Sequence, residues 1–316
     1  MQIKNVVFMG TPQFAVPTLE LLAKTRFKPV LCITQPDKPK GRKRKLQPPE
    51  VKIKAQELGI EIIQPEDVNN DDTFLKLQEL NPDVIITAAY GEYLKRKMRR
   101  LPSFGCLNLH PSLLPKYRGS APINFALFNG DEITGNTIFK IVAKMDAGPV
   151  YSQKKLEIKS EDCYTSLYEK LSKYGAEDVL EVLEKLEKNE IEPVPQDHDK
   201  ATFSHKLVKQ DFWMDWNNSA ENIFNQVRGL AEIPGTVAGF RGSRIKIIEI
   251  EILNEDSKEY PGSILDVIKN VGIKVSTAAK NILIKRLQPA GKKIMTAHAF
   301  SLGARIKNGE KFENGF

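Results

Sequence analysis

Val6-Val7-Phe8-Met9-Gly10-Thr11-Pro12 points to the fold class of this chain, because an uninterrupted apolar run meets a tight turn there. Apolar residues without polar alternation are typical of a parallel strand that is buried on both faces. Gly10 and Pro12 turn the chain, and apolar residues then recur at near-helical spacing from Phe14 to Leu22. The stretch therefore predicts a strand, a turn and a helix, which together form the repeating unit of an α/β sheet.

The same alternation continues outward from this stretch through the first half of the chain. Six further short runs are expected to form strands: Pro29–Thr34, Ile60–Ile63, Asp83–Ala88, Gly105–His110, Thr137–Val142 and Val150–Leu156. Helical spacing occurs from Val51 to Leu58 and again, over a much longer range, from Asp162 to Lys188. Strands that alternate with helices predict a Rossmann-like, doubly wound, mainly parallel α/β sheet.

The chain changes character after Asn189. Pro193 and Pro195 stand too close together for a helix, so residues 191–208 are interpreted as a linker. Beyond the linker we expect a helix from Ser219, as its N-cap, to Leu230, followed by short β-like runs between glycine turns. Such runs predict a small β-barrel. The expected domains are therefore residues 1–190 and 209–316.

Length and composition exclude several classes of protein. A chain of 316 residues suggests two domains, and 41% hydrophobic with 28% charged residues is typical of globular proteins. No apolar run approaches the ~20 residues that span a bilayer, and the N-terminus shows no secretory pattern. Cys32, Cys106 and Cys163 are far apart. We therefore expect no membrane association, no disulfide framework and a cytoplasmic location.

Several common chemistries lack their sequence motifs in this chain. Gly10 is not part of a G-x-G-x-x-G sequence, so a dinucleotide cofactor is not expected. The chain also lacks the phosphate-binding G-x-x-x-x-G-K-[ST] motif and the G-x-S-x-G nucleophile motif. Its four histidines lack the spacing of a zinc site, so we expect no metal.

Asn108 and His110 are the first candidate catalytic residues. Side chains alternate along a strand, so these two should share a face, and Pro111 ends the strand directly after them. They would lie at the carboxyl end of a strand, where open α/β sheets bind ligands. An amide donor can stabilise an oxyanion and an imidazole can move a proton, which suits acyl transfer. A histidine that only caps the strand end is the alternative.

Asp146 and the loop after His110 have two interpretations each. Asp146 stands before Gly148-Pro149 and could simply form a turn, or its carboxylate could orient His110 and favour the protonated ring. The loop from Ser112 to Gly119, with its Leu pair, could supply an apolar wall for a flat ligand, or could merely pack on the sheet.

Positive charge is concentrated in two regions of a chain whose net charge is +7. Six of the eight residues from Lys38 to Lys45 are basic, and residues 270–316 carry nine basic and two acidic side chains. Such segments suit an anionic partner, usually a nucleic acid, and a solvated surface is the alternative.

Motifs spread over nearly the whole chain resemble those of the methionyl-tRNA formyltransferases, a branch of the 10-formyltetrahydrofolate-dependent formyltransferase family. They are Gly10–Ala15, Gln35–Arg42, Asn108–Pro115, Arg118–Ile123, Met145–Pro149, Asp215-Trp216, Arg228–Leu230 and Leu287–Met295. The Asn-x-His…Asp trio belongs to the wider family. The basic loop and the second domain single out the enzymes that act on tRNA.

This resemblance implies an enzyme that moves a formyl group from 10-formyltetrahydrofolate to the α-amino group of charged initiator methionyl-tRNA, with no metal. The catalytic residues that it implies are Asn108, His110 and Asp146. The implied folate-binding residues are Ser112, Leu113, Leu114 and Pro115, and the implied tRNA-binding residues are Arg42, Lys43, Arg44 and Lys45. The second domain is expected to be an OB-like barrel that contacts tRNA.

Two alternatives and two departures accompany the resemblance. A relative that formylates a small amine, such as glycinamide ribonucleotide or an amino-sugar nucleotide, would share the trio but need neither the basic loop nor the barrel. A non-catalytic RNA-binding protein would explain the charge but not the trio. Lys43-Arg44-Lys45 follows Arg42, where the family often has Gly, and Ile123-Asn124-Phe125 also departs from the common pattern.

Overall fold

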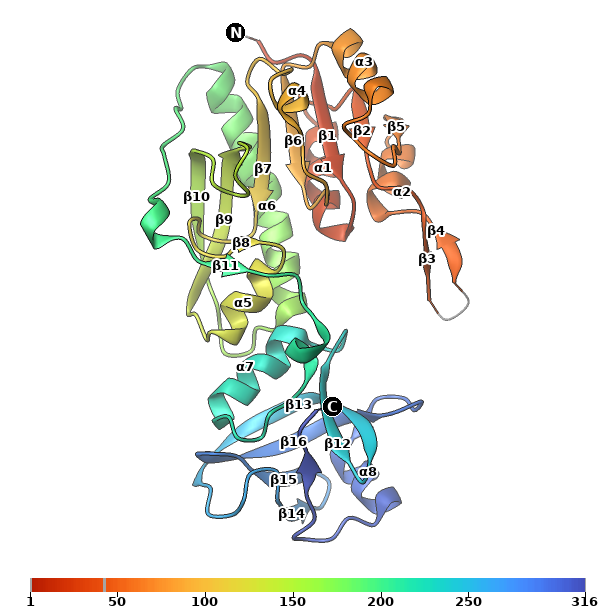
Figure 1. Ribbon diagram of the computed structural model, residues 1–316, viewed down its shortest axis with the longest axis vertical. Helices are drawn as coiled ribbons and strands as arrows, with labels where there is room; N and C mark the ends of the chain where they lie inside the picture. Colours follow the sequence, from red (N-terminus) through yellow and green to blue (C-terminus); the bar gives the residue numbers. More distant parts are fainter. Residues whose placement is uncertain (1, 42–43, 316) are drawn as a thin grey trace. The chain divides into compact units, whose positions relative to one another are not determined.

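A computed structural model describes residues 2–41 and 44–315 of the chain (Figure 1). Contacts between residues divide the chain into two compact units. The first comprises Met1–Pro122, Ile133–Glu157 and Tyr168–Ser204, and the second comprises Ile123–Glu132, Ile158–Leu167 and His205–Phe316. The domain boundaries expected at residues 190 and 208 stay a prediction.

The first unit is built on a seven-stranded, mainly parallel sheet. In spatial order its strands are β5 (Glu61–Ile63), β2 (Leu31–Ile33), β1 (Val6–Gly10), β6 (Val84–Ala88), β7 (Cys106–His110), β9 (Ile133–Lys140) and β10 (Val150–Glu157). The first five are parallel, whereas β9 runs antiparallel to β7 and β10 antiparallel to β9. The strand order reverses between β1 and β6, and open sheets bind ligands beside such a point.

Helices cover both faces of this sheet, which confirms the doubly wound arrangement. They are α1 (Val16–Ala23), preceded by the 3-10 turn η1 (Gln13–Ala15), α2 (Glu50–Glu57), α3 (Asp71–Leu80), α4 (Arg96–Arg99) and α6 (Tyr164–Glu187). Val7 and Met9 pack in one cluster with Leu77 of α3 and Met98 of α4. Ser172 of α6 donates a hydrogen bond of 2.6 Å to the carbonyl of Phe14, which connects α6 to η1.

The second unit contains a small barrel of antiparallel strands. In spatial order its strands are β14 (Ile264–Ile268), β15 (Gly272–Ser276), β16 (Lys280–Pro289), β13 (Ser243–Asp256), β12 (Thr236–Phe240) and β18 (Phe312–Glu313), and the short β17 (Met295–Thr296) pairs with β16. Backbone hydrogen bonds between Ile264 and both Gly309 and Glu310 join the two ends of this order. The curled sheet therefore has the barrel architecture expected from the sequence.

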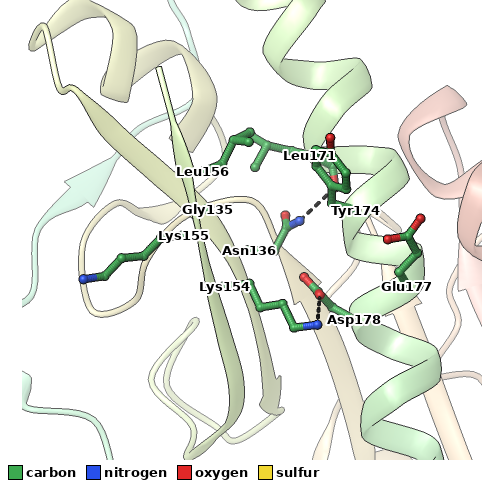
Figure 2. A pocket seen from close by; sticks show the side chains of 9 residues that line it. All are labelled: Gly135, Asn136, Lys154, Lys155, Leu156, Leu171, Tyr174, Glu177 and Asp178. Atoms are coloured by element: carbon green, nitrogen blue, oxygen red, sulfur yellow. Dashed lines mark hydrogen bonds and ion pairs between the residues drawn. The ribbon is translucent and has the colours of Figure 1, made fainter. Parts of the chain in front are cut away.

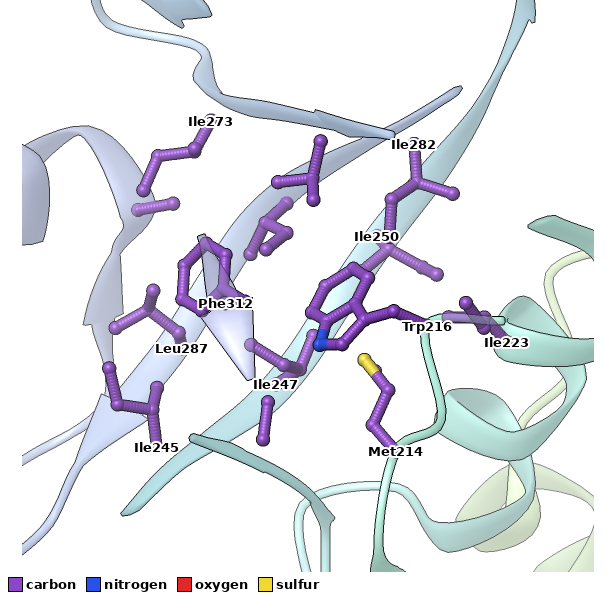
Figure 3. Packing of buried hydrophobic residues seen from close by; sticks show 14 of the residues in the cluster. Met214, Trp216, Ile223, Ile245, Ile247, Ile250, Ile273, Ile282, Leu287 and Phe312 are labelled. Atoms are coloured by element: carbon purple, nitrogen blue, oxygen red, sulfur yellow. The ribbon is translucent and has the colours of Figure 1, made fainter. Parts of the chain in front are cut away.

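A dense apolar core fills this barrel (Figure 3). Trp216 is 1% exposed and stacks on Phe312, with ring centroids 5.6 Å apart. Helix α7 (Ala220–Leu230) adds Ile223 to the same cluster, and Ala297 at the start of α8 (Ala297–Ala304) adds a further contact. Helix α5 (Pro122–Phe128) lies at the boundary between the two units along the chain. No helix in the described ranges is long and apolar enough to cross a membrane.

Ser219 caps α7 as the sequence predicts. Its side chain accepts a hydrogen bond from the backbone N–H of Asn222 at 3.2 Å. We expect Ser219→Ala to destabilise the second unit by about 1 kcal/mol, because one N–H of the first turn loses its acceptor. Urea unfolding followed by tryptophan fluorescence measures this, since both tryptophans, Trp213 and Trp216, lie in this unit.

The matched control for this cap is Ser219→Asp, which keeps a side-chain acceptor at the same position and should retain the stability of the parent. An equal loss of stability in both variants would show that the hydrogen bond to Asn222 is not the cause.

Candidate active site

Strand β7 carries Asn108 and His110 to the carboxyl edge of the parallel sheet. The strand ends at His110, as the sequence predicts. Asn108 is half-buried and His110 is 4% exposed. Because β6 and β7 run parallel, Thr87 lies directly beside Asn108, and its hydroxyl lies 2.6 Å from Oδ1 of Asn108. Sequence analysis did not single out Thr87, because its neighbour is set by the strand register.

A hydrogen bond of the His110 ring indicates which of its two nitrogens carries a proton. Nε2 lies 3.0 Å from the carbonyl oxygen of Tyr117. A carbonyl only accepts hydrogen bonds, so Nε2 carries a proton and donates it to this contact. Nδ1 is therefore the nitrogen that can gain or lose a proton. It faces Oδ2 of Asp146 at 3.8 Å, a separation longer than a hydrogen bond.

Asp146 is held beside His110 by the backbone of another loop. Its Oδ2 accepts a hydrogen bond of 2.8 Å from the N–H of Gly119. The backbone of Asp146 is left-handed, with φ of 48°, which is uncommon for a residue other than glycine. Asp146 therefore forms a turn, and the same turn also brings its carboxylate towards Nδ1 of His110.

Two contacts fix the turn that carries Asp146. A Cβ atom at Gly148 would lie 1.7 Å from the carbonyl oxygen of Lys140, so only glycine permits this close approach of backbone to backbone. Nε2 of Gln196 donates to the carbonyls of Asp146 and Gly148 at 2.9 and 2.7 Å. The position of the carboxylate thus depends on residues about 50 positions apart in the sequence.

Arg118 is buried against the same turn, with 1% exposure. Its Nε and Nη2 donate to Oε1 of Gln196 at 3.2 and 2.7 Å. Burial lowers the pKa of the Arg118 guanidinium, and the negative charge of Asp146 opposes this shift. Arg118 begins the motif Arg118–Ile123, but sequence analysis gave this residue no role of its own at the site.

The sequence matches two family models in succession. Residues 3–183 match the formyl transferase model, and residues 206–305 match the model of the formyl transferase C-terminal domain. The chain belongs to the formyl transferase family. The first match covers the sheet that carries Asn108, and the second covers most of the barrel that follows it.

Similar proteins carry related names. A protein of Thermodesulfovibrio yellowstonii named methionyl-tRNA formyltransferase is 43% identical over 96% of this chain and 97% of its own length. The structure of the sugar 3N-formyl transferase WlaRD, with dTDP and 5-N-formyl-THF, has a TM-score of 0.67 at 20% identity and covers 93% of this chain and 100% of that one. The structure of HypX from Aquifex aeolicus with tetrahydrofolic acid has a TM-score of 0.63 at 18% identity over 98% of this chain. This chain spans about half of HypX, 49% of its length.

The loop after His110 is tied closely to β9 in this family member. Ser112 is fully buried, and its hydroxyl donates to the carbonyl of Lys116 at 2.6 Å. Leu114 is 4% exposed, and its N–H donates to the hydroxyl of Thr137 at 3.1 Å. Leu113 is half-buried. The assignment of Ser112, Leu113, Leu114 and Pro115 to a folate site stays a prediction.

The described part of the basic loop includes β3 (Lys38–Lys40), which pairs with β4 (Lys45–Gln47) in a two-stranded hairpin (Figure 1). Arg42 and Lys43 lie outside the described residues. Arg44 and Lys45 are exposed. At the base of the hairpin, Nζ of Lys52 lies 2.8 Å from Oδ1 of Asp37, and this hydrogen bond holds the pKa of the Asp37 carboxyl below its usual range.

A separate hollow of about 270 Å³ lies between β9, β10 and α6 (Figure 2). Nζ of Lys154 and Oδ1 of Asp178 are 3.0 Å apart there, and Asn136 donates to the carbonyl of Leu171 at 2.9 Å. Burial raises the pKa of Asp178, and the hydrogen bond from Lys154 opposes the shift. None of the three candidate catalytic residues lines this hollow. Within the described ranges, no cluster of His, Cys, Asp and Glu is arranged to hold a metal ion.

Proposed function

We propose that this enzyme transfers the formyl group of 10-formyltetrahydrofolate to the α-amino group of methionyl-tRNA. The observation that carries the proposal is the 43% identity, over nearly the full length of both chains, to a relative named methionyl-tRNA formyltransferase. That similarity includes the C-terminal segment as well as the sheet. Since the acceptor is a charged tRNA, the proposed location of the enzyme is the cytoplasm.

The proposed reaction begins with attack of the neutral amine on the formyl carbon. A free α-amino group has a pKa of about 7.7–8.0, so a usable fraction is neutral near pH 7. The new C–N bond converts the formyl oxygen into an oxyanion. We assign Nδ2 of Asn108 to this oxyanion, because an amide N–H at the sheet edge is a fixed donor for developing charge.

His110 and Asp146 handle the protons in this proposal. With Nε2 bound to the carbonyl of Tyr117, Nδ1 of His110 is the nitrogen that donates to the intermediate. Asp146, 3.8 Å from Nδ1, stabilises the protonated ring and accepts the proton that the attacking amine releases, directly or through water. The intermediate collapses when its bond to the folate nitrogen breaks, and that nitrogen leaves with a proton from the same network.

Folate and tRNA are the proposed ligands of different parts of the chain. The folate assignment is supported by family membership and by two structures with the same fold, one with tetrahydrofolic acid and one with 5-N-formyl-THF. We assign Ser112–Pro115 to folate, and we assign the hairpin residues Arg42–Lys45 and the barrel to tRNA. A basic surface favours the phosphates of a nucleic acid.

A formyl-transfer assay tests the proposed function. The purified enzyme is incubated with 10-formyltetrahydrofolate and one acceptor at a time, namely methionyl-tRNA, glycinamide ribonucleotide and an amino-sugar nucleotide. We expect formylation of methionyl-tRNA alone. Turnover of a small amine in place of the tRNA would refute the proposal and favour the small-acceptor alternative.

The hairpin tip should contribute to the salt dependence of tRNA binding. We expect the double variant Arg44→Ala, Lys45→Ala to bind methionyl-tRNA more weakly and to reduce the slope of log affinity against log salt by roughly 0.7–0.9 for each lost phosphate contact. Folate affinity should stay unchanged, because a small co-substrate needs one pocket only. Binding of both ligands is measured across a salt series.

The matched control for the hairpin removes two exposed lysines elsewhere in the same unit, Lys155 of β10 and Lys173 of α6. Strand β10 forms one edge of the sheet, whereas β2, which leads into the hairpin, lies near the other edge. The control loses the same net charge and should keep the parental slope. Equal slopes for the two double variants would argue against a specific role of the hairpin.

A further inference from the structure

Thr87 makes a close contact with the amide of Asn108. The residue belongs to β6, is 4% exposed, and is the register partner of Asn108 on β7. Its hydroxyl oxygen lies 2.6 Å from Oδ1 of Asn108 and 3.1 Å from the carbonyl oxygen of Leu107. A hydroxyl has one proton to donate, so the two distances indicate where that proton goes.

The shorter distance assigns the proton to the Asn108 contact. Bonds between a hydroxyl and an oxygen are usually about 2.7–2.8 Å long, whereas bonds from an amide N–H to oxygen are about 2.9–3.0 Å. A separation of 2.6 Å between Thr87 and Asn108 thus fits O–H···O and not N–H···O. The hydroxyl of Thr87 therefore donates and Oδ1 of Asn108 accepts.

This assignment fixes which end of the amide is available to a ligand. With Oδ1 held by Thr87, the other end of the half-buried Asn108 side chain is the Nδ2 donor. Among the described residues, Nδ2 makes no hydrogen bond of its own. A flipped amide would present an acceptor instead, and an acceptor facing a developing oxyanion would be repulsive.

We propose that Thr87 is a positioning residue that locks the Asn108 amide with its N–H donors directed towards the substrate. The inference rests on the proposed formyl transfer and adds to it a residue from a neighbouring strand. Thr87 itself does not touch the reacting atoms. It acts by removing the unproductive amide orientation before the substrate binds, which is preorganisation of an oxyanion donor.

The test compares Thr87→Val, which keeps the shape and removes the hydroxyl, with Thr87→Ser, which keeps the hydroxyl. Wild-type turnover of methionyl-tRNA is measured first, because its absence would refute the proposed function and not this inference. With an active wild type, we expect Thr87→Val to lower kcat roughly two- to tenfold, the range of one net hydrogen bond of about 0.5–1.5 kcal/mol. KM should change little, and Thr87→Ser should retain most of kcat.

A double variant separates positioning from a general structural effect. In the Asn108→Ala background the amide is gone, so Thr87→Val should cause no further loss of kcat. Unchanged kcat in the single valine variant, or the same loss in both backgrounds, would overturn the inference. If the valine variant does not fold, Thr87→Cys, whose thiol is only a weak donor, takes its place with the same expected pattern.

Discussion

Asn108→Ala is expected to lower kcat for formyl transfer by roughly 10²–10³-fold, the usual cost of removing one oxyanion donor. The amide lies at the carboxyl end of β7 and is half-buried, so the truncation removes a donor from the site and little of the core. The fold should survive, because the apolar residues of β7, such as Leu107 and Leu109, stay in place. Single-turnover measurements with methionyl-tRNA give the rate, and circular dichroism checks the fold.

Asn108→Asp is the informative companion to this variant. The aspartate keeps the shape and can still accept the hydrogen bond from Thr87, but it has no N–H donor and adds a negative charge beside the developing oxyanion. We therefore expect a loss of kcat at least as large as that of Asn108→Ala. Near-parental turnover in either variant would remove Asn108 from the proposed mechanism.

The fold was predictable because the sequence pattern reports burial directly. All five residues of β1 are buried, as the unbroken apolar run from Val6 predicts. The helix expected over Asp162–Lys188 is α6, and the barrel strands follow the glycine-punctuated runs. Helix α3 was not anticipated, although Asn70 caps it by accepting from the N–H of Thr73 at 2.7 Å and two aspartates follow.

The barrel was predicted, but the residues that close it were not, for a physical reason. The hydrogen bonds that join Ile264 to Gly309 and Glu310 link residues about 45 positions apart. Ile264 begins β14, but Gly309 and Glu310 lie in no strand, so local patterns carry no signal of this pairing. Sequence analysis interpreted residues 270–316 through their positive charge and did not consider that the segment near Gly309 could pair with β14.

In the candidate site, too, the sequence predicts contacts within one strand but not contacts between segments that are far apart in the chain. Strand alternation placed Asn108 and His110 together, because they are two residues apart. Alternation carries no information about Thr87, which depends on the register between β6 and β7, or about Arg118, which depends on contacts with Gln196. The distance from His110 to Asp146 depends on the turn at Gly148, where the carbonyl oxygen of Lys140 lies in the space that a side chain at position 148 would need.

Asp146→Asn is expected to lower kcat by roughly 10²–10⁴-fold, the usual range for loss of a positioned acid or base. The variant is nearly isosteric, and its side-chain oxygen can still accept from the N–H of Gly119 at 2.8 Å, so the turn should persist. What disappears is the negative charge 3.8 Å from Nδ1 of His110 and the acceptor for the amine proton. The loss should therefore appear in the chemical step and not in the affinity for folate or tRNA.

The measurement is a pH–rate profile under single-turnover conditions, with folate and tRNA binding measured in parallel. Because asparagine cannot accept the proton that the attacking amine releases, the rate of the chemical step should fall across the whole profile. Asp146→Ala serves as the structural control, because it also loses the acceptor for the Gly119 N–H. If Asp146→Asn keeps the parental rate and profile while Asp146→Ala is impaired, the carboxylate serves the turn alone and His110 must act without a charged partner.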